Sequence, residues 1–213
     1  MHLLSIQIGK PQPLRYRDQA VMSAINKTGV TGSVYLSEVN FDGDAQADLV
    51  NHGGQDKAVN AYCAEHYPYW AKRLQRDLVH GAFGENVTVS GMTEDIVCIG
   101  DTFRLGEAVV QISQPRQPCF KLGAKHNEPE MPVWVQETGY TGYYFRVLKP
   151  GNVTPGTPTE LIERHPAGIT VAFANRIKYF DKNDREALEL LAGLPVLAEA
   201  WRSSFQARLN KII

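Results

Sequence analysis

The stretch GDTFRLGEAVVQISQPRQPC, residues 100–119, carries the strongest structural signal in the chain. Two apolar segments, 102–105 and 108–114, flank a glycine-containing turn, which predicts a hairpin of two strands. The second strand runs into QPRQPC (114–119), where two prolines stiffen the backbone and remove two hydrogen-bond donors. We therefore expect a rigid loop that leaves a sheet and ends at Cys119.

Cys119 lies three residues after Arg116, whose positive charge favours a thiolate. One interpretation is a metal ligand or a nucleophile, and the other is a small buried apolar residue beside a turn. The residues alone leave this choice open. Cys63 and Cys98 fall in a predicted helix and a predicted strand, so we expect both in the core. Three cysteines without a C-x-x-C pair predict neither a disulfide framework nor a zinc motif, and they favour a reducing compartment.

Short apolar segments bounded by Gly, Asp or Pro predict further strands on both sides of this stretch. Their close spacing is typical of a small barrel or sandwich. Apolar residues at helical spacing predict one intervening helix over 63–78, and Ala64-Glu65-His66 is expected on its exposed face. The predicted strands are residues 3–8, 33–36, 86–89, 96–99, 102–105, 108–114, 143–148 and 159–164. We therefore expect a mostly β domain over residues 1–165.

The pattern becomes helical after residue 168 and predicts three short helices over residues 168–213. Thr170 is the expected cap of the first helix, and Asn183 or Asp184 caps a second that ends at Gly193. Pro195 opens the third. Helices of this size are poorly stable alone, so we expect them to pack on the barrel or on a partner chain, including a second copy of this chain.

The 213 residues include 22 Lys plus Arg and 23 Asp plus Glu, which gives a formal net charge of −1. This balance argues against binding to nucleic acid polymers or to a membrane surface, although it allows a local basic pocket. The sequence has no run of 18 apolar residues and no signal-peptide pattern at its start. We therefore expect no membrane span and a cytoplasmic protein.

Two more segments have the composition of a binding site. In NHGGQDKAV (51–59), paired glycines allow close approach of the backbone to a ligand, and His52 and Lys57 could hold an anion such as phosphate. The spacing does not match a P-loop, and a turn with solvated charges is the alternative. In GEN (84–86), Asn86 could bond the edge of a heterocycle, because its amide both donates and accepts, or it could close a turn. Arg146 would be a pocket cation if its side chain pointed inward.

The segments HGGQDKAV (52–59), FGENV (83–87), GD (100–101) and QISQPRQPC (111–119), in this order, resemble the MOSC domain family over about residues 20–163. The helices that begin with ITVAFANRI (169–177) resemble the three-helix domain of the YiiM branch of that family. The resemblance implies a closed β-barrel-like fold with peripheral helices that binds the molybdenum cofactor, molybdopterin. It also implies that Cys119 ligates molybdenum.

The branch resemblance further implies reduction of N-hydroxylated compounds, such as 6-hydroxylaminopurine, to amines. A separate flavoprotein reductase would supply the electrons, because the chain shows no flavin or nicotinamide motif. A carrier that binds the cofactor or its sulfur without turnover is the alternative. The cofactor phosphate needs cations, for which Arg15 and Lys27 are further candidates, while Asp56 and Glu85 either hold turns or deliver protons. The expected cofactor-binding residues are His52, Gly53, Lys57, Asn86, Ser113, Gln114 and Arg116.

Overall fold

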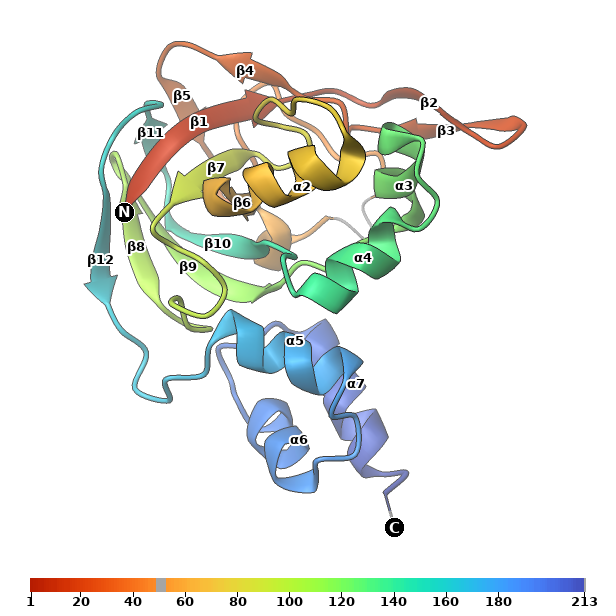
Figure 1. Cartoon of the computed structure of the whole chain (residues 1–213). Coiled ribbons are helices and arrows are strands. Elements are labelled where there is room, and N and C mark those ends of the chain that lie inside the picture. Colours follow the sequence, from red (N-terminus) through yellow and green to blue (C-terminus); the bar gives the residue numbers. More distant parts are fainter. Residues whose placement is uncertain (49–52, 213) are drawn as a thin grey trace.

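The computed structural model describes residues 1–48 and 53–212, and a large mixed sheet dominates this part of the chain (Figure 1). The sheet has eight strands in the order β12-β8-β9-β10-β6-β7-β1-β4. All neighbouring strands are antiparallel except β6 and β7, which are parallel. The strands are β1 (His2–Ile8), β4 (Thr28–Val30), β6 (Val59–Cys63), β7 (Val87–Ser90), β8 (Thr102–Leu105), β9 (Ala108–Pro115), β10 (Tyr143–Lys149) and β12 (Thr159–Glu163).

The sheet curls until β1, the strand next to one end, approaches the segment before β12 at the other end. Leu3 N donates to Thr157 O at 3.0 Å, and Gly156 N donates to Leu3 O at 2.8 Å. These bonds join β1 to the segment that leads into β12 at the opposite end of the sheet. The curl is therefore barrel-like. Within the described residues, however, no continuous ladder of hydrogen bonds closes the sheet into a full barrel.

Alternation of apolar side chains explains why the strands bury one face. Phe103 on β8, Val110 and Ile112 on β9 and Phe145 on β10 are fully buried, and the rings of Phe103 and Phe145 pack edge to face at 6.1 Å. Every second side chain along a strand points to the same face of the sheet. These residues therefore form one continuous core across the strands.

Smaller elements surround the sheet. Two further antiparallel pairs are the hairpin of β2 (Gln12–Tyr16) with β3 (Gln19–Ser23), and the long-range pair of β5 (Val34–Leu36) with β11 (Gly151–Val153). The first pair projects from the body beside α3 (Figure 1). Three helices, α2 (Tyr67–Leu74), α3 (Phe120–His126) and α4 (Met131–Thr138), pack around a second core that contains Tyr62, Trp70 and Phe83. Single turns of 3₁₀ helix occur at η1 (Gln55–Lys57) and η2 (Ala64–His66).

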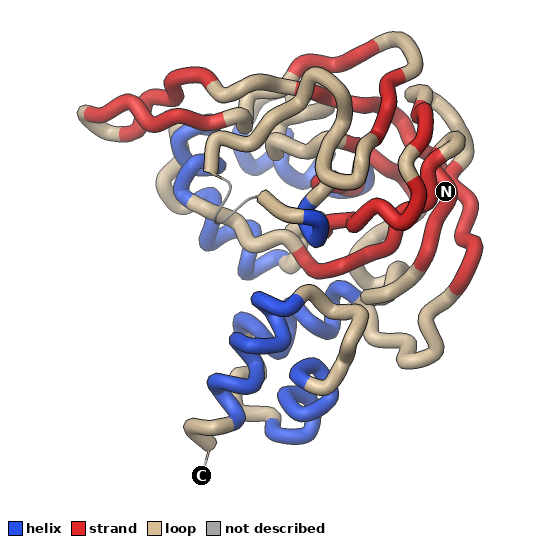
Figure 2. The backbone as a smooth tube through the Cα atoms, turned by 180° about the vertical axis from the view of Figure 1, so that it is seen from behind, coloured by secondary structure: helices blue, strands red, loops and turns tan. Residues whose placement is uncertain are grey.

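The last three helices, α5 (Val171–Tyr179), α6 (Arg185–Ala192) and α7 (Glu199–Leu209), form a group of their own below the strands (Figure 2). Thr170 and Asp184 cap α5 and α6 as predicted, because each side chain accepts from a backbone N–H three residues on. The group packs on its own chain, since Ala198 N donates to Ser113 O on β9 and Val171 N donates to Val97 O.

Several predictions of local structure are wrong. Pro195 does not open the third helix, because it lies in a turn and α7 begins only at Glu199. Residues 96–99 form turns with an isolated bridge at Cys98, because Asp101 Oδ2 accepts from Cys98 N and bends the chain there. The expected helix over 63–78 begins only at Tyr67, since Cys63 is the last residue of β6. None of the helices in the described part of the chain combines the length and apolar character that a bilayer span requires.

Candidate functional site

A pocket of about 630 Å³, measured with its open mouth, lies where the loop after β9 meets residues 23–27 and 44–48. The first residue of this loop lining the pocket is Arg116, and Cys119 lies at its end. The charged lining consists of four cationic side chains and two carboxylates, namely Lys27, Lys57, Arg116, Lys121, Asp44 and Asp48. The pocket of this nearly neutral chain therefore has an excess of positive charge, which suits an anionic ligand.

Cys119 is half-buried and is the N-cap residue of α3, in an extended conformation with φ −127° and ψ 168°. Its carbonyl oxygen accepts from Leu122 N at 3.0 Å, which fixes the start of the helix. The other two cysteines are buried as predicted, with 0% and 4% exposure for Cys63 and Cys98. Among the three thiols, Cys119 is the one that lines the pocket.

Arg116 is a buried cation whose guanidinium is only partly bonded. It is 5% exposed, its backbone N donates to Gly142 O at 3.0 Å, and its Nη2 donates to Phe83 O at 2.8 Å. Its Nη1 is buried and finds no hydrogen-bond acceptor among the described residues, and no described carboxylate lies within 4.0 Å of it. A buried donor on a permanent charge is costly unless something outside the protein pairs with it.

Two asparagines brace the wall of the pocket. The Asn86 amide is fully used within the protein: its Oδ1 accepts from Asn60 N at 3.1 Å, and its Nδ2 donates to Asp44 Oδ2 at 2.8 Å and to Gln7 O at 3.3 Å. These bonds correspond to the turn-holding interpretation of Asn86. Asn60 Nδ2 donates to Gly84 O, but its Oδ1 is buried without a partner among the described residues. Asn60 therefore offers an acceptor in the same pocket that offers the donor of Arg116.

Burial changes the ionisation of the pocket lysines. Desolvation lowers the pKa of Lys27, although its ion pair with Asp44 partly offsets the effect. Desolvation also lowers the pKa of Lys57, and Asp56 and Asp48 act in the opposite direction. Lys57 is the last residue of η1, so the turn that the paired glycines begin delivers this side chain to the pocket.

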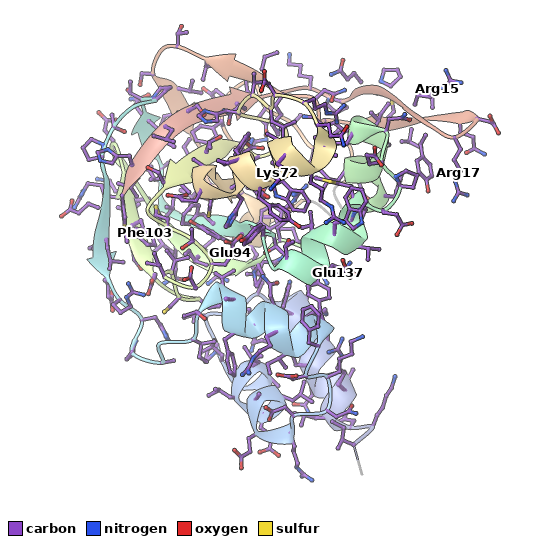
Figure 3. All side chains as sticks on the ribbon, viewed as in Figure 1. Arg15, Arg17, Lys72, Glu94, Phe103 and Glu137 are labelled. Atoms are coloured by element: carbon purple, nitrogen blue, oxygen red, sulfur yellow. The ribbon has the colours of Figure 1, made fainter. Side chains whose placement is uncertain are left out.

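The structure brings four of the predicted site residues together at the pocket: Lys57, Asn86, Arg116 and Cys119. His52 lies outside the described residues. Gly53, Ser113 and Gln114 are not among the residues that line the pocket. Ser113 instead packs behind the wall, with its Oγ 2.6 Å from Asp56 O and 3.0 Å from Tyr144 O. Lys27 lines the pocket, whereas Arg15 lies on the projecting hairpin (Figure 3).

The two carboxylates considered as proton donors hold turns. Glu85 is fully buried and accepts hydrogen bonds from Tyr67 Oη, Gly81 N and Phe83 N, among others. Asp56 forms an ion pair with Arg146 at 2.6 Å. That pair accounts for the charge of Arg146, which does not line the pocket.

Sequence reasoning missed Asn60, Tyr144, Asp44 and Lys121 as lining residues. Asn60 had a detectable signal, because it is the one amide in the otherwise apolar strand VNAYC (59–63), all of whose residues are buried. Asp44 and Lys121 had none, since short charged segments at turns are ordinary on protein surfaces.

The structure is thus a β-domain with a curled mixed sheet and a basic pocket that Cys119 helps to line. Residues 48–160 match the MOSC domain, and residues 169–211 match the YiiM-like, 3-alpha helix domain. The chain therefore belongs to the MOSC domain family and carries the helical domain of its YiiM-like members.

Relatives and solved structures agree with this assignment. The chain is 53% identical to the uncharacterized protein YflK of Bacillus subtilis over 99% of this chain and 96% of that protein. It is 39% identical to protein YiiM of Escherichia coli over 87% of this chain and 84% of that protein. It is also 39% identical to a protein of Gibberella moniliformis named "Reductase", over 68% of this chain but only 26% of that protein. The crystal structure of YiiM from Geobacillus stearothermophilus superposes with a TM-score of 0.85 at 41% identity, covering 98% of both chains.

Proposed function

We propose that this protein uses the molybdenum cofactor to reduce N-hydroxylated compounds, such as 6-hydroxylaminopurine, to amines with electrons from a separate flavoprotein. One observation carries the proposal: the pocket combines a thiol, Cys119, with a buried guanidinium, Arg116, that has an unpaired Nη1. The matching reductase of Gibberella moniliformis supports a redox function.

The residues present fit the cofactor. A pterin that carries a phosphate needs cationic donors for the phosphate, a polar acceptor for a ring N–H, and a soft ligand for the metal. Arg116 Nη1 and Lys121 can meet the phosphate, Asn60 Oδ1 is the orphaned acceptor, and Cys119 Sγ is the soft ligand. When bound, the cofactor supplies the oxygen-atom and electron transfer, while the protein supplies binding, charge and access.

The protein's own residues position this set. The loop that carries Arg116 is held at its backbone by Gly142 O and at its side chain by Phe83 O. Gly84, which lines the pocket, needs its positive φ of 72°, and a side chain there would approach Ile25 Cγ1 to 2.5 Å. Residue 84 must therefore be glycine for the wall next to residues 23–27 to form.

The test compares wild type with Cys119→Ala, both expressed in a host that makes the molybdenum cofactor. We expect near-stoichiometric molybdenum by mass spectrometry and reduction of 6-hydroxylaminopurine with a competent reductase in the wild type. The variant should lose both and keep its melting temperature, because Cys119 is half-buried at the pocket rim. Cys98→Ala is the matched control for loss of a thiol elsewhere and should keep its molybdenum.

Turnover in Cys119→Ala would show that the ligand assignment is wrong. A fully loaded wild-type protein that reduces none of a panel of N-hydroxylated compounds, with a competent reductase present, would identify a cofactor carrier instead. Absence of molybdenum from both proteins would contradict the cofactor itself.

A further inference from the structure

Three buried side chains of metal-ligand type meet at one point outside the pocket. Cys63 Sγ, His66 Nε2 and a Glu94 carboxylate oxygen all lie within 4.8 Å of one another. His66 Nε2 is 2.6 Å from Glu94 Oε2, and Cys63 Sγ is 3.9 Å from the same oxygen. Glu94 lies inside the molecule between α2 and α5 in the view of Figure 3. The prediction that His66 lies on an exposed helix face is wrong, since His66 is 5% exposed.

The elements that carry the three residues are firmly fixed. Cys63 is the last residue of β6 and His66 the last residue of η2, so a single turn of 3₁₀ helix sets their separation. Glu94 comes from the turn after β7, and its backbone oxygen accepts from Ala172 N on α5 at 2.8 Å. The three side chains are therefore held close together by secondary structure and a hydrogen-bonded turn, and not by a mobile surface loop.

Contacts around the cluster resemble the outer shell of a metal site. Glu94 Oε1, the oxygen that faces away from His66, accepts from Gly142 N at 2.7 Å. The imidazole of His66 stacks on Tyr140 with ring centres 3.8 Å apart and planes 9° apart. The hydrogen bond from Gly142 N orients the Glu94 carboxylate, and hydrogen bonds of this kind raise metal affinity. Met92 O accepts from Cys63 Sγ at 3.2 Å and from Tyr143 Oη at 3.0 Å, which holds the thiol in place.

We propose that Cys63 Sγ, His66 Nε2 and Glu94 Oε2 form a structural site for a divalent ion of borderline softness, Zn²⁺ in the first place. Thiolate, imidazole and carboxylate are the three ligand types that Zn²⁺ takes in proteins. Bond lengths of about 2.0–2.3 Å require the His66–Glu94 pair to open by less than roughly 1 Å. The site shares no residue with the pocket lining and does not depend on the proposed reductase function.

The protonation balance follows from the ligand atoms. Desolvation and the neighbouring Glu94 raise the pKa of the Cys63 thiol well above its usual range, so without a metal the sulfur keeps its proton. Zn²⁺ replaces this proton, and the proton on His66 Nε2 leaves for solvent or moves to the other ring nitrogen. Each ion bound therefore releases the thiol proton of Cys63.

A filled site would brace the neighbouring pocket. Gly142, held by Glu94 through its N–H, accepts from Arg116 N through its carbonyl oxygen. Gly142 has a φ of 70°, and a Cβ there would lie 2.3 Å from Ala61 O, so this close approach requires glycine. The ion would thus fix the loop that presents Arg116.

The experiment uses the full chain, purified without chelators from zinc-supplemented cells. We expect one zinc per chain by elemental analysis in the wild type and in the matched control Cys98→Ser, which removes another buried thiol. Cys63→Ser, His66→Gln and Glu94→Gln should each lose zinc, with affinity falling by more than the roughly 10- to 100-fold that loss of an outer-shell contact costs. Co²⁺ in place of zinc should give a thiolate charge-transfer band that Cys63→Ser abolishes.

A second measurement does not depend on the folding of the variants. EDTA should lower the melting temperature of the wild type, added Zn²⁺ should restore it, and calorimetry in two buffers should report the release of at least the Cys63 thiol proton per ion. Metal-free wild type with an unchanged melting temperature in excess Zn²⁺ would overturn the proposal. Equal zinc content in all the ligand variants would also overturn it, because the metal would then be adventitious.

Discussion

Two buried charged groups, the Glu85 carboxylate and the Arg116 guanidinium, both contact residues 81–85. The carboxylate has a full set of hydrogen-bond partners, and the guanidinium does not. Glu85 is 0% exposed and accepts from Gly81 N at 2.7 Å, Phe83 N at 3.0 Å and Thr88 Oγ1 at 3.0 Å, and from Tyr67 Oη as well. Arg116 is 5% exposed, yet its guanidinium donates to Phe83 O and leaves Nη1 unpaired among the described residues.

This difference separates residues that serve the fold from residues that serve a ligand. Native proteins pair nearly all buried polar groups, so a complete set of partners indicates a structural role. An unpaired charge at the wall of a pocket indicates that the missing partner comes from outside. By this criterion Glu85 fixes the turn, and Arg116 is kept for an anion.

Glu85→Ala tests the structural side and should have the largest effect. It would leave four buried hydrogen-bond donors without an acceptor, and each unsatisfied donor costs about 1–3 kcal/mol of folding free energy. We expect the free energy of unfolding to fall by about 3 kcal/mol or more, measured by chemical denaturation. Glu137→Ala, on the exposed side of α4, is the matched control and should change little. A loss below about 1 kcal/mol for Glu85→Ala would remove the contrast with Arg116.

Arg116→Met tests the ligand side. Methionine keeps much of the side-chain length. Removal of the uncompensated buried charge offsets loss of the bond to Phe83 O, so the ligand-free protein should stay within about 1 kcal/mol of wild-type stability. Loss of a charge-assisted hydrogen bond should instead weaken binding of inorganic phosphate by roughly 10- to 100-fold, and molybdenum loading with it. Calorimetric titration with phosphate measures the effect, with Arg104→Met, from an exposed ion pair, as the control. Strong destabilisation with unchanged phosphate affinity would assign Arg116 to the fold.

The sequence was most informative where local chemistry decides the structure. The pair 102–105 and 108–114, the caps Thr170 and Asp184, and the end of α6 at Gly193 all follow from side-chain periodicity and capping, and all are confirmed. The hairpin of β2 and β3 was missed because Pro11 and Pro13 indicate a chain break. Helices α3 and α4 were missed because they are short, with seven and eight residues, and neither has the capping side chain that indicated α5 and α6.

The site was only partly predictable for a related reason. Lys57, Arg116 and Cys119 belong to recognisable segments, and the pocket brings them together. Asn60 acquires its role from tertiary pairing, since the strand around it looks like ordinary core. The Cys63–His66–Glu94 cluster joins residues about 30 positions apart, so no local pattern could predict it.

The smallest expected effect concerns His126, which contacts the same turn as Glu85 and Arg116. Its Nε2 donates to Ala82 O at 2.9 Å and its Nδ1 accepts from Arg76 Nη2 at 2.7 Å, so the imidazole is neutral. Burial lowers the pKa of His126 to about 4 from its usual 6.5. The unfolded chain therefore binds more protons between these values, and stability is lost as the pH falls through this window.

Between pH 7 and pH 5.5 this linkage should cost the wild type about 1 kcal/mol of unfolding free energy. His126→Gln, which keeps a donor for Ala82 O but cannot titrate, should lack this component, while His80→Gln, from an exposed imidazole, should retain it. Chemical denaturation at both pH values provides the measurement, and equal pH dependence in all three proteins would contradict the prediction. A histidine can give up its charge when it is buried, but an arginine cannot. His126 is buried without a partner charge because its imidazole is neutral. Arg116 stays charged, so its burial calls for a bound anion.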